Sequence, residues 1–496
     1  MIEVITNING IINNFVWGIP MLILLVGTGI LMTVLTKVFQ ISHFGYWVKH
    51  TLGSIFTDKH ITKHTDKDDK SISQFQSLCT ALAATIGTGN IVGVSSALLF
   101  GGPGSIFWMW IVAFFGMMTN YSENVLGIYY RKKNDKDEWS GGAMYYLRDG
   151  LGSKHGMKQA GAILAVLFSI FCLFASFGIG NMSQINSIAG NMKAAFGIPN
   201  LVSGILLMIL AGLVVLGGIK RIASVTEKLV PFMAIFYIIG AVILCAVNGD
   251  QIIPALASIF KGAFAMKAVG GGVVGSGVKM ALTWGMKRGV FSNEAGLGSS
   301  VMVHSSSNVR EPVRQGMWGI FEVFADTIVV CSLTALTVLT SGLVDLDTGV
   351  VISDAEGSAL VGEAFAKVFG AAGPAFIAIA ILLFAFSTVL GWSHYGSKAF
   401  EYLFGSGAII VYRIIFIVFI LGGATMSLDL AWDLSDTFNG LMAIPNLIGV
   451  LALSPVVCRI TKNYVDRRIR GLNVEPMLSA LPDIQKIQAT GLDDSD

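Results

Sequence analysis

The stretch Ala-Leu-Ala-Ala-Thr-Ile-Gly-Thr-Gly-Asn-Ile-Val-Gly, residues 81–93, decides how the rest of the chain is organised. It lies in an uncharged run, residues 75–100, long enough to cross a bilayer as a helix at about 1.5 Å per residue. Gly87 and Gly89 each cost roughly 1 kcal/mol relative to alanine inside a helix, and polar residues surround them. The stretch therefore predicts a membrane span that is broken in its middle.

An interrupted span of this kind is a candidate binding site. In hydrocarbon, freed backbone groups persist only where protein or a watery cavity satisfies them, so half-helix ends and bare carbonyls face a solute or an ion. The alternative is a small-residue face for helix packing, because Gly89 and Gly93 have the Gly-x-x-x-Gly spacing.

Composition sets the class of protein. Hydrophobic residues make up 54% of the chain and charged residues 13%, with a mean hydropathy of +0.70. An average soluble domain has about 25% charged residues, so we predict an all-α polytopic membrane protein. The net charge of +2 gives no indication of nucleic-acid binding. The five cysteines stand singly in apolar runs, which predicts neither a metal site nor disulfides.

Eleven segments of the chain are apolar enough to be predicted as membrane spans. They are residues 15–36, 76–100, 104–130, 160–189, 200–218, 229–247, 273–300, 315–341, 373–397, 408–426 and 437–458. The first has no basic residue before it, so we interpret it as a retained span and not as a signal peptide. Segment 273–300 is the weakest, because Lys279, Lys287, Arg288 and Glu294 interrupt it.

Charges in the connecting loops predict the orientation. Lys and Arg gather in residues 37–70, 131–136, 220–228 and 459–470, on alternate connections, whereas residues 345–363 are acidic. Because short cytoplasmic loops carry excess Lys and Arg, we predict a multi-pass plasma-membrane protein with its N-terminus outside and its C-terminus in the cytoplasm.

A second interrupted span occurs five spans after the first. Its core, residues 277–289, is rich in glycine, and we expect it to break at Thr283–Gly285. The two interrupted spans run in opposite senses, which predicts two five-helix repeats of inverted topology, each opening with a discontinuous helix. Interrupted segments at matching positions of inverted halves are typical of the central site of a transporter.

The predicted organisation has five parts. Residues 37–75 mix apolar and basic side chains, as an interfacial helix followed by a polar loop does; a short linker is the alternative. The parts are an extra N-terminal span with this segment (1–75), a first repeat (76–247), an external connection (248–272), a second repeat (273–458) and a cytoplasmic tail (459–496).

Several long motifs resemble the alanine/glycine:cation symporter family, also called the sodium:alanine symporters. They are Gly-Thr-Gly-Asn-Ile-Val-Gly-Val (87–94), Gly-Gly-Pro-Gly-Ser-Ile-Phe-Trp-Met-Trp (101–110), Gly-Asn-Met-Ser-Gln-Ile-Asn-Ser (180–187), Gly-Val-Phe-Ser-Asn-Glu-Ala-Gly-Leu-Gly-Ser (289–299), Phe-Ala-Asp-Thr (324–327) and Gly-Trp-Ser-His-Tyr-Gly-Ser-Lys (391–398). The resemblance implies sodium-coupled uptake of small neutral amino acids such as alanine and glycine. It also implies a leucine-transporter-like fold of the amino acid–polyamine–organocation type.

A zwitterionic solute needs donors for its carboxylate and acceptors for its ammonium group. The half-helix that starts near Gly89 offers N–H groups and a positive dipole end, and the carbonyls near Thr85 and at Thr283–Gly285 suit an ammonium. Lys287 and Arg288 follow the expected second break, and we interpret them as lying towards the cytoplasmic end, paired with carboxylates or backbone and not with the solute.

The resemblance implies the residues around the solute, which are Thr88, Gly89, Gln184, Trp284, Met286 and Trp392. The residues themselves support these roles unevenly. Gln184 and Asn181 share a helix face and can converge on a solute, but an ordinary interhelical hydrogen bond is an equal alternative. Core packing is the more common role for a single tryptophan such as Trp284 or Trp392.

The coupling ion is predicted to be Na⁺, and no other cofactor is expected. Phe384, Ser387 and Thr388 place one carbonyl and two hydroxyls on a single helix face. Resemblance to the fold adds the facing carbonyls of Ala83 and Ile86. The alternative is that both hydroxyls bond back to their own helix.

Further polar groups lie within the predicted spans. Asn90 is a candidate ligand of a second cation. Proton coupling, the alternative mechanism, needs a titratable side chain in the core. The candidates for it are Glu123, Glu322, Asp326 and His394. Asp326 has a second possible role, which is to neutralise one of the basic residues of 273–300. By resemblance to proton-coupled relatives of the fold, the absence of lysine from residues 229–247 favours sodium.

The sequence thus predicts a sodium-coupled symporter of small neutral amino acids that works by alternating access. A glutamine-preferring permease is an alternative, since Met286 leaves more room than a larger residue. A passive channel is less consistent with the sequence, because no charged ring or carbonyl filter occurs at mid-membrane. No metal motif, nucleophile elbow or phosphate loop points to an enzyme.

Overall fold

Helices dominate the part of the chain that the computed structural model describes, which is residues 2–65, 69–154, 156–264, 276–426, 429–490 and 492. In these ranges the only strands form two short antiparallel hairpins, β1 (Lys132–Lys133) with β2 (Trp139–Ser140) and β3 (Val344–Asp345) with β4 (Val350–Val351). Residues 265–275, which include the start of the predicted span 273–300 and the end of the predicted connection 248–272, lie outside the described residues.

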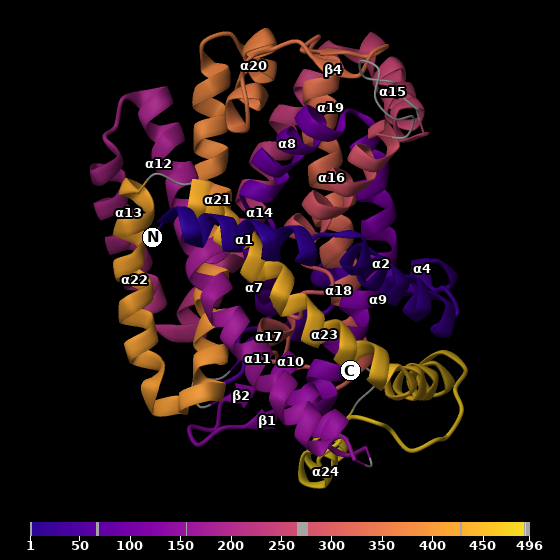
Figure 1. Cartoon of the computed structure of the whole chain (residues 1–496). Coiled ribbons are helices and arrows are strands. Elements are labelled where there is room, and N and C mark those ends of the chain that lie inside the picture. The colour runs from indigo at the N-terminus through magenta and orange to yellow at the C-terminus, as the bar shows by residue number, and fades with distance from the viewer. Residues whose placement is uncertain are drawn as a thin grey trace.

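The N-terminal segment has two longer helices followed by a chain of short ones. Its helices are α1 (Ile2–Val16), α2 (Ile19–Leu35), α3 (Phe39–Ser42), α4 (Phe44–Val48), the π-turn η1 (Lys49–Gly53), α5 (Ser54–Thr57) and α6 (Lys59–Thr62). Figure 1 shows α1 crossing in front of the other helices, and α1 and α2 both pack against α23. Phe56 is 87% exposed on the short helices, and the interfacial interpretation of residues 37–75 stays a prediction.

Two further groups of helices make up the body of the molecule. The first group comprises α7 (Gln74–Thr85), η2 (Thr88–Asn90), α8 (Val92–Gly101), α9 (Gly104–Tyr130), α10 (Ala143–Tyr145), η3 (Tyr146–Leu151), α11 (Lys158–Phe177), η4 (Gly178–Met182), α12 (Ser183–Phe196), α13 (Asn200–Val215) and α14 (Gly218–Val247). The second comprises η5 (Gly249–Gln251), α15 (Ile252–Phe264), α16 (Ser276–Asn293), α17 (Val301–His304), α18 (Pro312–Val323), η6 (Phe324–Cys331), α19 (Ser332–Thr340), α20 (Ser358–Phe369), α21 (Ala372–Phe404), η7 (Ser406–Ala408), α22 (Ile409–Thr425), α23 (Asp429–Tyr464), η8 (Val465–Ile469) and α24 (Pro482–Thr490).

Helices occupy all eleven predicted ranges, as far as these ranges are described. Within the described ranges, seven helices are long and apolar enough to cross a membrane, and the bent pair α7 and α8 makes an eighth. The molecule is therefore a helical, multi-pass membrane protein.

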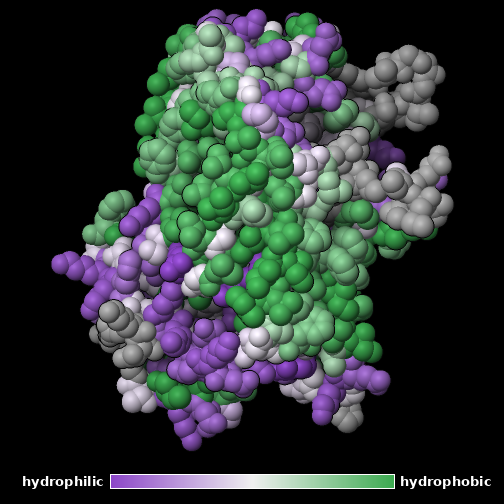
Figure 2. Space-filling view, turned by 90° about the vertical axis from the view of Figure 1, so that its left-hand side faces the viewer, coloured by the Kyte–Doolittle hydropathy of each residue, from purple (hydrophilic) through white to green (hydrophobic). Residues whose placement is uncertain are grey.

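The outer surface agrees with a lipid environment. Figure 2 shows hydrophobic side chains over the middle of one face, with hydrophilic side chains gathered at both ends. On α13 and α22, large apolar side chains are exposed, such as Leu213 at 62% and Val418 at 58%. A soluble protein buries such helices, whereas lipid tails cover them here without cost.

The two ends of the molecule differ. In Figure 1, α20, β4 and α15 lie at the upper end, whereas the β1–β2 hairpin and α24 lie at the lower end. The lower end carries Lys132, Lys133 and the Arg467–Glu311 ion pair (2.7 Å), and the upper end carries the acidic residues Glu356 and Glu363.

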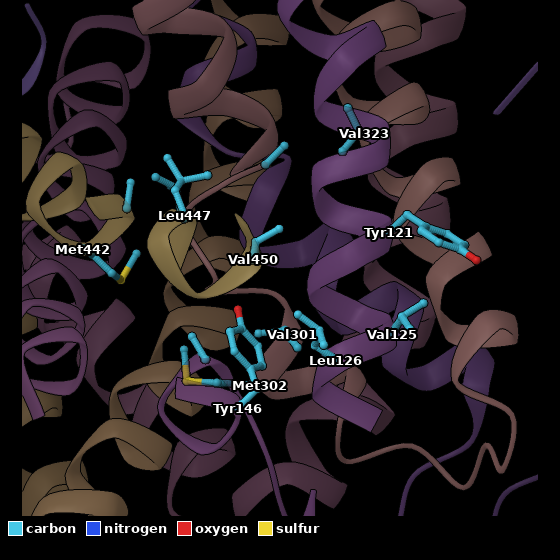
Figure 3. Packing of buried hydrophobic residues seen from close by; sticks show 14 of the residues in the cluster. Tyr121, Val125, Leu126, Tyr146, Val301, Met302, Val323, Met442, Leu447 and Val450 are labelled. Atoms are coloured by element: carbon cyan, nitrogen blue, oxygen red, sulfur yellow. The ribbon is translucent and has the colours of Figure 1, made fainter. Parts of the chain in front are cut away.

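The largest hydrophobic cluster joins both groups of helices. Figure 3 shows part of it, with Leu126 from α9, Val301 and Met302 from α17, and Leu447 and Val450 from α23 around one space. All five side chains are fully buried. This cluster fixes α17 and α23 against α9 just below the second interruption.

The second interruption lies elsewhere than predicted. The expected break at Thr283–Gly285 is wrong, because α16 is continuous from Ser276 to Asn293. Gly285 serves helix packing instead: a Cβ there would lie 2.3 Å from the carbonyl oxygen of Ser105 on α9. The small residue thus lets two helices approach closely, which is the helix-packing alternative considered for the first span.

The chain breaks further on, between α16 and α17. Glu294, Gly296 and Gly298 have φ angles of +57°, +93° and +71°, which no helix accommodates. The first interruption is at the predicted place, where α7 and α8 meet at a bend of 57° with Gly87 between them. Both bends occur at a Gly-x-Gly sequence, 87–89 and 296–298.

Candidate functional site

The first interruption is held open by side chains from other helices. The amide N–H of Gly87 donates to Asn90 Oδ1 (2.9 Å), and Asn90 Nδ2 donates to Asp326 Oδ1 on η6 (2.7 Å). The amide N–H of Thr88 donates to Gln184 Oε1 on α12 (3.2 Å). Backbone donors that a continuous helix would use internally are therefore satisfied from α12 and, through Asn90, from η6.

Gly87 allows the closest approach at this bend. A Cβ at this position would lie 2.4 Å from Thr388 Oγ1 and 3.3 Å from Gln184 Oε1. Any side chain here would therefore collide with α21. The sequence predicted a broken helix at Gly87, but not which other helix approaches it.

Thr88 and Gly89 lie at the start of the second half-helix. Thr88 is fully buried, and its hydroxyl has no hydrogen-bond partner among the described residues. A Cβ added at Gly89 would lie 3.2 Å from the ring of Phe291 on α16. A buried hydroxyl without a partner costs about 1–3 kcal/mol, which a polar ligand at this point would recover.

Four of the five residues predicted to bind the ion come together. The hydroxyls of Ser387 and Thr388 each lie 3.1 Å from the carbonyl oxygen of Ala83, across the interface between α21 and α7. They lie 2.8 Å and 3.1 Å from the carbonyl oxygen of Phe384 in their own helix. The hydroxyls thus also bond back to their own helix, which was the alternative considered. Together these contacts bring four oxygens close to one another, the two hydroxyls and the carbonyl oxygens of Ala83 and Phe384. Ile86, the fifth residue, is buried directly after α7 ends.

Trp392 connects α21 to the second interruption. Its indole N–H donates to Glu294 Oε1 (2.8 Å), and the ring is 1% exposed. A Cβ at Gly180 in η4 would lie 2.4 Å from Cβ of Trp392, so only glycine admits the tryptophan there. Gln184 is one turn further along, in α12, and its Nε2 donates to the carbonyl oxygen of Ile179 (3.0 Å). Gln184 and Trp392 therefore flank the same π-turn.

Glu294 is a site residue that the sequence analysis missed. Ser299 Oγ donates to Glu294 Oε2 (2.5 Å), so the carboxylate bridges the break and also holds Trp392. The signal was present in the sequence, because Gly296 and Gly298 repeat the Gly-x-Gly spacing of the first interruption. The prediction placed the break at the earlier glycines of α16 instead.

A cavity of about 800 Å³ opens above the first interruption, between α8, α12, α16 and α20. Trp284, Lys287, Arg288 and Phe291 line it at the spacing of one helix face. Met286 is not among the lining residues; it is 7% exposed and belongs to the core cluster. The structure thus brings Trp284 to the cavity and gives no support to Met286 as a determinant of solute size.

Lys287 and Arg288 do not follow the second break, and this expectation is corrected. Because α16 continues to Asn293, both residues lie before the break, and they share the cavity with Glu356 next to α20. Lys287 does pair with a carboxylate, Asp436 on α23, at 2.7 Å.

The buried carboxylates that were considered for proton coupling have neutral or histidine partners. Glu123 accepts from Asn446 Nδ2 (2.5 Å), and Glu322 lies 3.0 Å from His304 Nε2. Asp326 accepts from Asn90, Ser292 and Thr327, so the described contacts do not pair it with a basic residue of α16. His394 lines a separate cavity of about 210 Å³ near the β1–β2 hairpin.

Comparison with known proteins assigns the family. Residues 2–477 match the sequence pattern of the sodium:alanine symporter family. The chain belongs to this family. The sodium/alanine symporter AgcS of Methanococcus maripaludis is 46% identical over 458 residues, which cover 92% of this chain and 96% of that protein. GlnT of Bacillus subtilis, named as a probable sodium/glutamine symporter, is 36% identical and covers 95% of this chain and 93% of its own length.

The fold of this family member has a counterpart among solved structures. MhsT, solved in complex with L-phenylalanine, superposes with a TM-score of 0.51 at 14% identity. The match covers 79% of this chain and 99% of MhsT. At this identity the likeness concerns the fold alone, and it agrees with the expected leucine-transporter-like architecture.

Proposed function

We propose that this protein imports small neutral amino acids such as alanine together with Na⁺, by alternating access. The observation that carries the proposal is the meeting of two sets of polar atoms at the first interruption. Ser387 and Thr388 face the carbonyl of Ala83, and Gln184 faces the amide of Thr88. Family membership and the sodium/alanine symporter AgcS as a relative give independent support.

The solute site lies between the two interruptions. The N-terminal end of the half-helix formed by η2 and α8, at Thr88 and Gly89, receives the carboxylate, because its amides and dipole favour an anion. Gln184 and Trp392 flank this point, and Phe291 covers it from the cavity side. Trp284 and Met286 complete the predicted set; Trp284 stands at the mouth of the cavity, and no contact described here supports Met286.

The sodium site consists of the carbonyls of Ala83, Ile86 and Phe384 and the hydroxyls of Ser387 and Thr388. Hard oxygen ligands without a carboxylate suit a monovalent hard cation. Asn90 remains a candidate for a second cation, although its amide already bonds to Gly87 and Asp326. The close approach of α21 to Gly87 places the ion next to the half-helix that holds the solute carboxylate, which couples their binding.

The architecture proposed for transport is two inverted repeats of five spans, residues 76–247 and 273–458, after an extra N-terminal span, which makes eleven spans. Three of these, α9, α13 and the α16–α17 pair, supplement the eight that length and composition identify. The two Gly-x-Gly bends then occupy the first helix of each repeat, which is where such folds bind their cargo.

The orientation proposed is that of the loop charges, with the N-terminus outside and the C-terminal tail, 459–496, in the cytoplasm of a plasma membrane. The basic β1–β2 hairpin is then cytoplasmic. The cavity of about 800 Å³ lies at the end that carries α20 and is therefore an external vestibule.

Uptake into proteoliposomes tests the function. Labelled alanine, glycine and glutamine are offered under an imposed sodium gradient, a proton gradient or neither. We expect alanine to accumulate above its external concentration only with the sodium gradient. Accumulation driven by protons alone would contradict the ion assignment, and equilibration without accumulation would indicate a channel.

A further inference from the structure

The external vestibule contains a cation that forms no ion pair with the described residues. Arg288 lines this cavity, and its Nε atom is buried without a hydrogen-bond partner in the described part of the chain. Its neighbour Lys287 is neutralised by Asp436 at 2.7 Å, whereas no ion pair to Arg288 occurs among the described residues. An unpaired guanidinium in a cavity needs a functional explanation, because such groups normally find acceptors.

Aromatic rings hold this guanidinium in place. Its central carbon lies 5.3 Å from the ring centroid of Trp284 and 5.5 Å from that of Phe291. Cation–π contacts at these distances orient the group but leave its N–H donors in the guanidinium plane available. The planar fork of arginine matches a carboxylate with two parallel hydrogen bonds.

Arg288 stands directly above the proposed solute site. A Cβ added at Gly93 would lie 3.9 Å from Cδ of Arg288, and Gly93 is one helical turn beyond Gly89. The ring of Phe291 contacts both the guanidinium and the Gly89 position, so it separates the vestibule from the point where the carboxylate is bound.

The opposite wall of the vestibule carries the complementary charge. Glu356, directly before Gly357 and α20, lines the same cavity and is exposed, with no ion pair among the described contacts. Gly357 lies close to α8, because a Cβ there would be 3.5 Å from Val92 Cγ1. The cavity thus presents a cation and an anion on different walls, as recognition of a zwitterion requires.

We infer that the vestibule is a second, lower-affinity site for the amino acid, with its carboxylate on Arg288 and its ammonium towards Glu356. This inference rests on the proposed function. The solute waits here until Phe291 moves and then passes one helical turn inward to Thr88 and Gly89. The site belongs to the external face only, so it affects capture from outside and not binding from inside.

Kinetics from the two sides of the membrane test the site. Arg288→Gln is expressed in intact cells, which present the vestibule outward, and assayed in parallel in inside-out vesicles. We expect the external KM for alanine to rise about tenfold, with the maximal rate within about twofold and the KM from the inner face unchanged. Arg288→Lys keeps the charge but loses the planar fork, so its external KM should lie between those of the wild type and Arg288→Gln.

The matched control is Lys279→Gln, which removes an exposed charge from the same helix outside the cavity and should leave every value unchanged. An unchanged external KM in Arg288→Gln would overturn the inference, as would an equal rise on both faces or a lower maximal rate at normal KM. If the wild-type protein itself fails to accumulate alanine with sodium, the proposed function is wrong. This outcome differs from the failure of the second site alone, in which the wild-type protein accumulates alanine and Arg288→Gln has an unchanged external KM.

A binding measurement separates the vestibule from the inner site. Gly89→Leu fills the inner site, and Trp284, which contacts Arg288, reports on the vestibule by its fluorescence. Alanine should still change the signal of this variant without sodium, and alaninamide, which lacks a carboxylate, should not. Trp284→Phe should remove this fluorescence change, which assigns the change to Trp284. No response to alanine in the Gly89→Leu protein would overturn the inference.

Discussion

Gly87→Ala is the substitution that tests the coupling geometry most directly. The added Cβ would lie 2.4 Å from Thr388 Oγ1, whereas ordinary contact begins near 3.4 Å, so the hydroxyl or the half-helix must shift by about 1 Å. The φ angle of Gly87 is −134°, outside the left-handed region that favours glycine, so we attribute the expected effect to this contact. Such overpacking costs about 1–3 kcal/mol.

This cost is borne at the sodium site, because Thr388 is one of its proposed ligands. If all of it opposes ion binding, the sodium concentration for half-maximal uptake rises about 5- to 150-fold. Sodium-dependent uptake of alanine measures this directly. The sodium-induced rise in melting temperature of the purified protein should shrink in parallel, since a ligand stabilises the folded state according to its affinity.

Gly93→Ala is the matched control for this substitution. It lies on the same half-helix, and its Cβ would have an ordinary contact of 3.9 Å. It should therefore leave the half-saturation unchanged. In the background of Thr388→Ala, the additional change Gly87→Ala should have a smaller effect, because the colliding oxygen is gone. A normal sodium response in Gly87→Ala, or an equal loss in both glycine variants, would refute the reasoning.

Three further sets of variants distinguish the ion site, the solute site and helix packing. Ser387→Ala combined with Thr388→Ala removes two ligands and should raise the sodium concentration for half-maximal uptake by about 10- to 100-fold. The KM for alanine at saturating sodium should change little. A raised alanine KM with an unchanged sodium dependence would reject the ion assignment. Gln184→Leu leaves the buried amide of Thr88 without an acceptor, so it should abolish uptake and lower the free energy of unfolding by about 1–3 kcal/mol. Gln184→Glu keeps an acceptor and should have a normal melting temperature. Gly285→Ala should lower the melting temperature, because its Cβ clashes with α9. The sodium concentration for half-maximal uptake by the protein that still folds should be unaltered. A changed value would favour the predicted break at Thr283–Gly285.

The first interruption could be predicted from sequence because polar residues accompany its glycines, which the helix-packing alternative does not require. Residues 81–93 combine two glycines with polar neighbours inside an uncharged span, and no helix in hydrocarbon keeps that combination without a partner. The face of Phe384, Ser387 and Thr388 was likewise predictable, since helical spacing fixes which side chains point together. The chain itself thus specified the two elements that meet at the proposed ion site.

The second interruption could not be located in the same way, because glycine has two uses. Gly285 and Gly289 weaken a helix by propensity, but in the folded protein they admit α9, with Cβ positions 2.3 Å from Ser105 O and 2.8 Å from Val112 Cγ1. Only the neighbouring helix distinguishes a packing glycine from a breaking one. The misplaced break also put Arg288 after the interruption, whereas it lies before it in α16.

The sequence alone determined the class of protein, the number of apolar segments, the place of the first bend and the family, because these depend on composition, local propensity and contiguous motifs. Tertiary structure alone decided where the second helix stops, that Glu294 holds Trp392, and that Arg288 faces a cavity. The physical reason is that such contacts depend on which helices lie side by side, and residues far apart in the chain supply the partners.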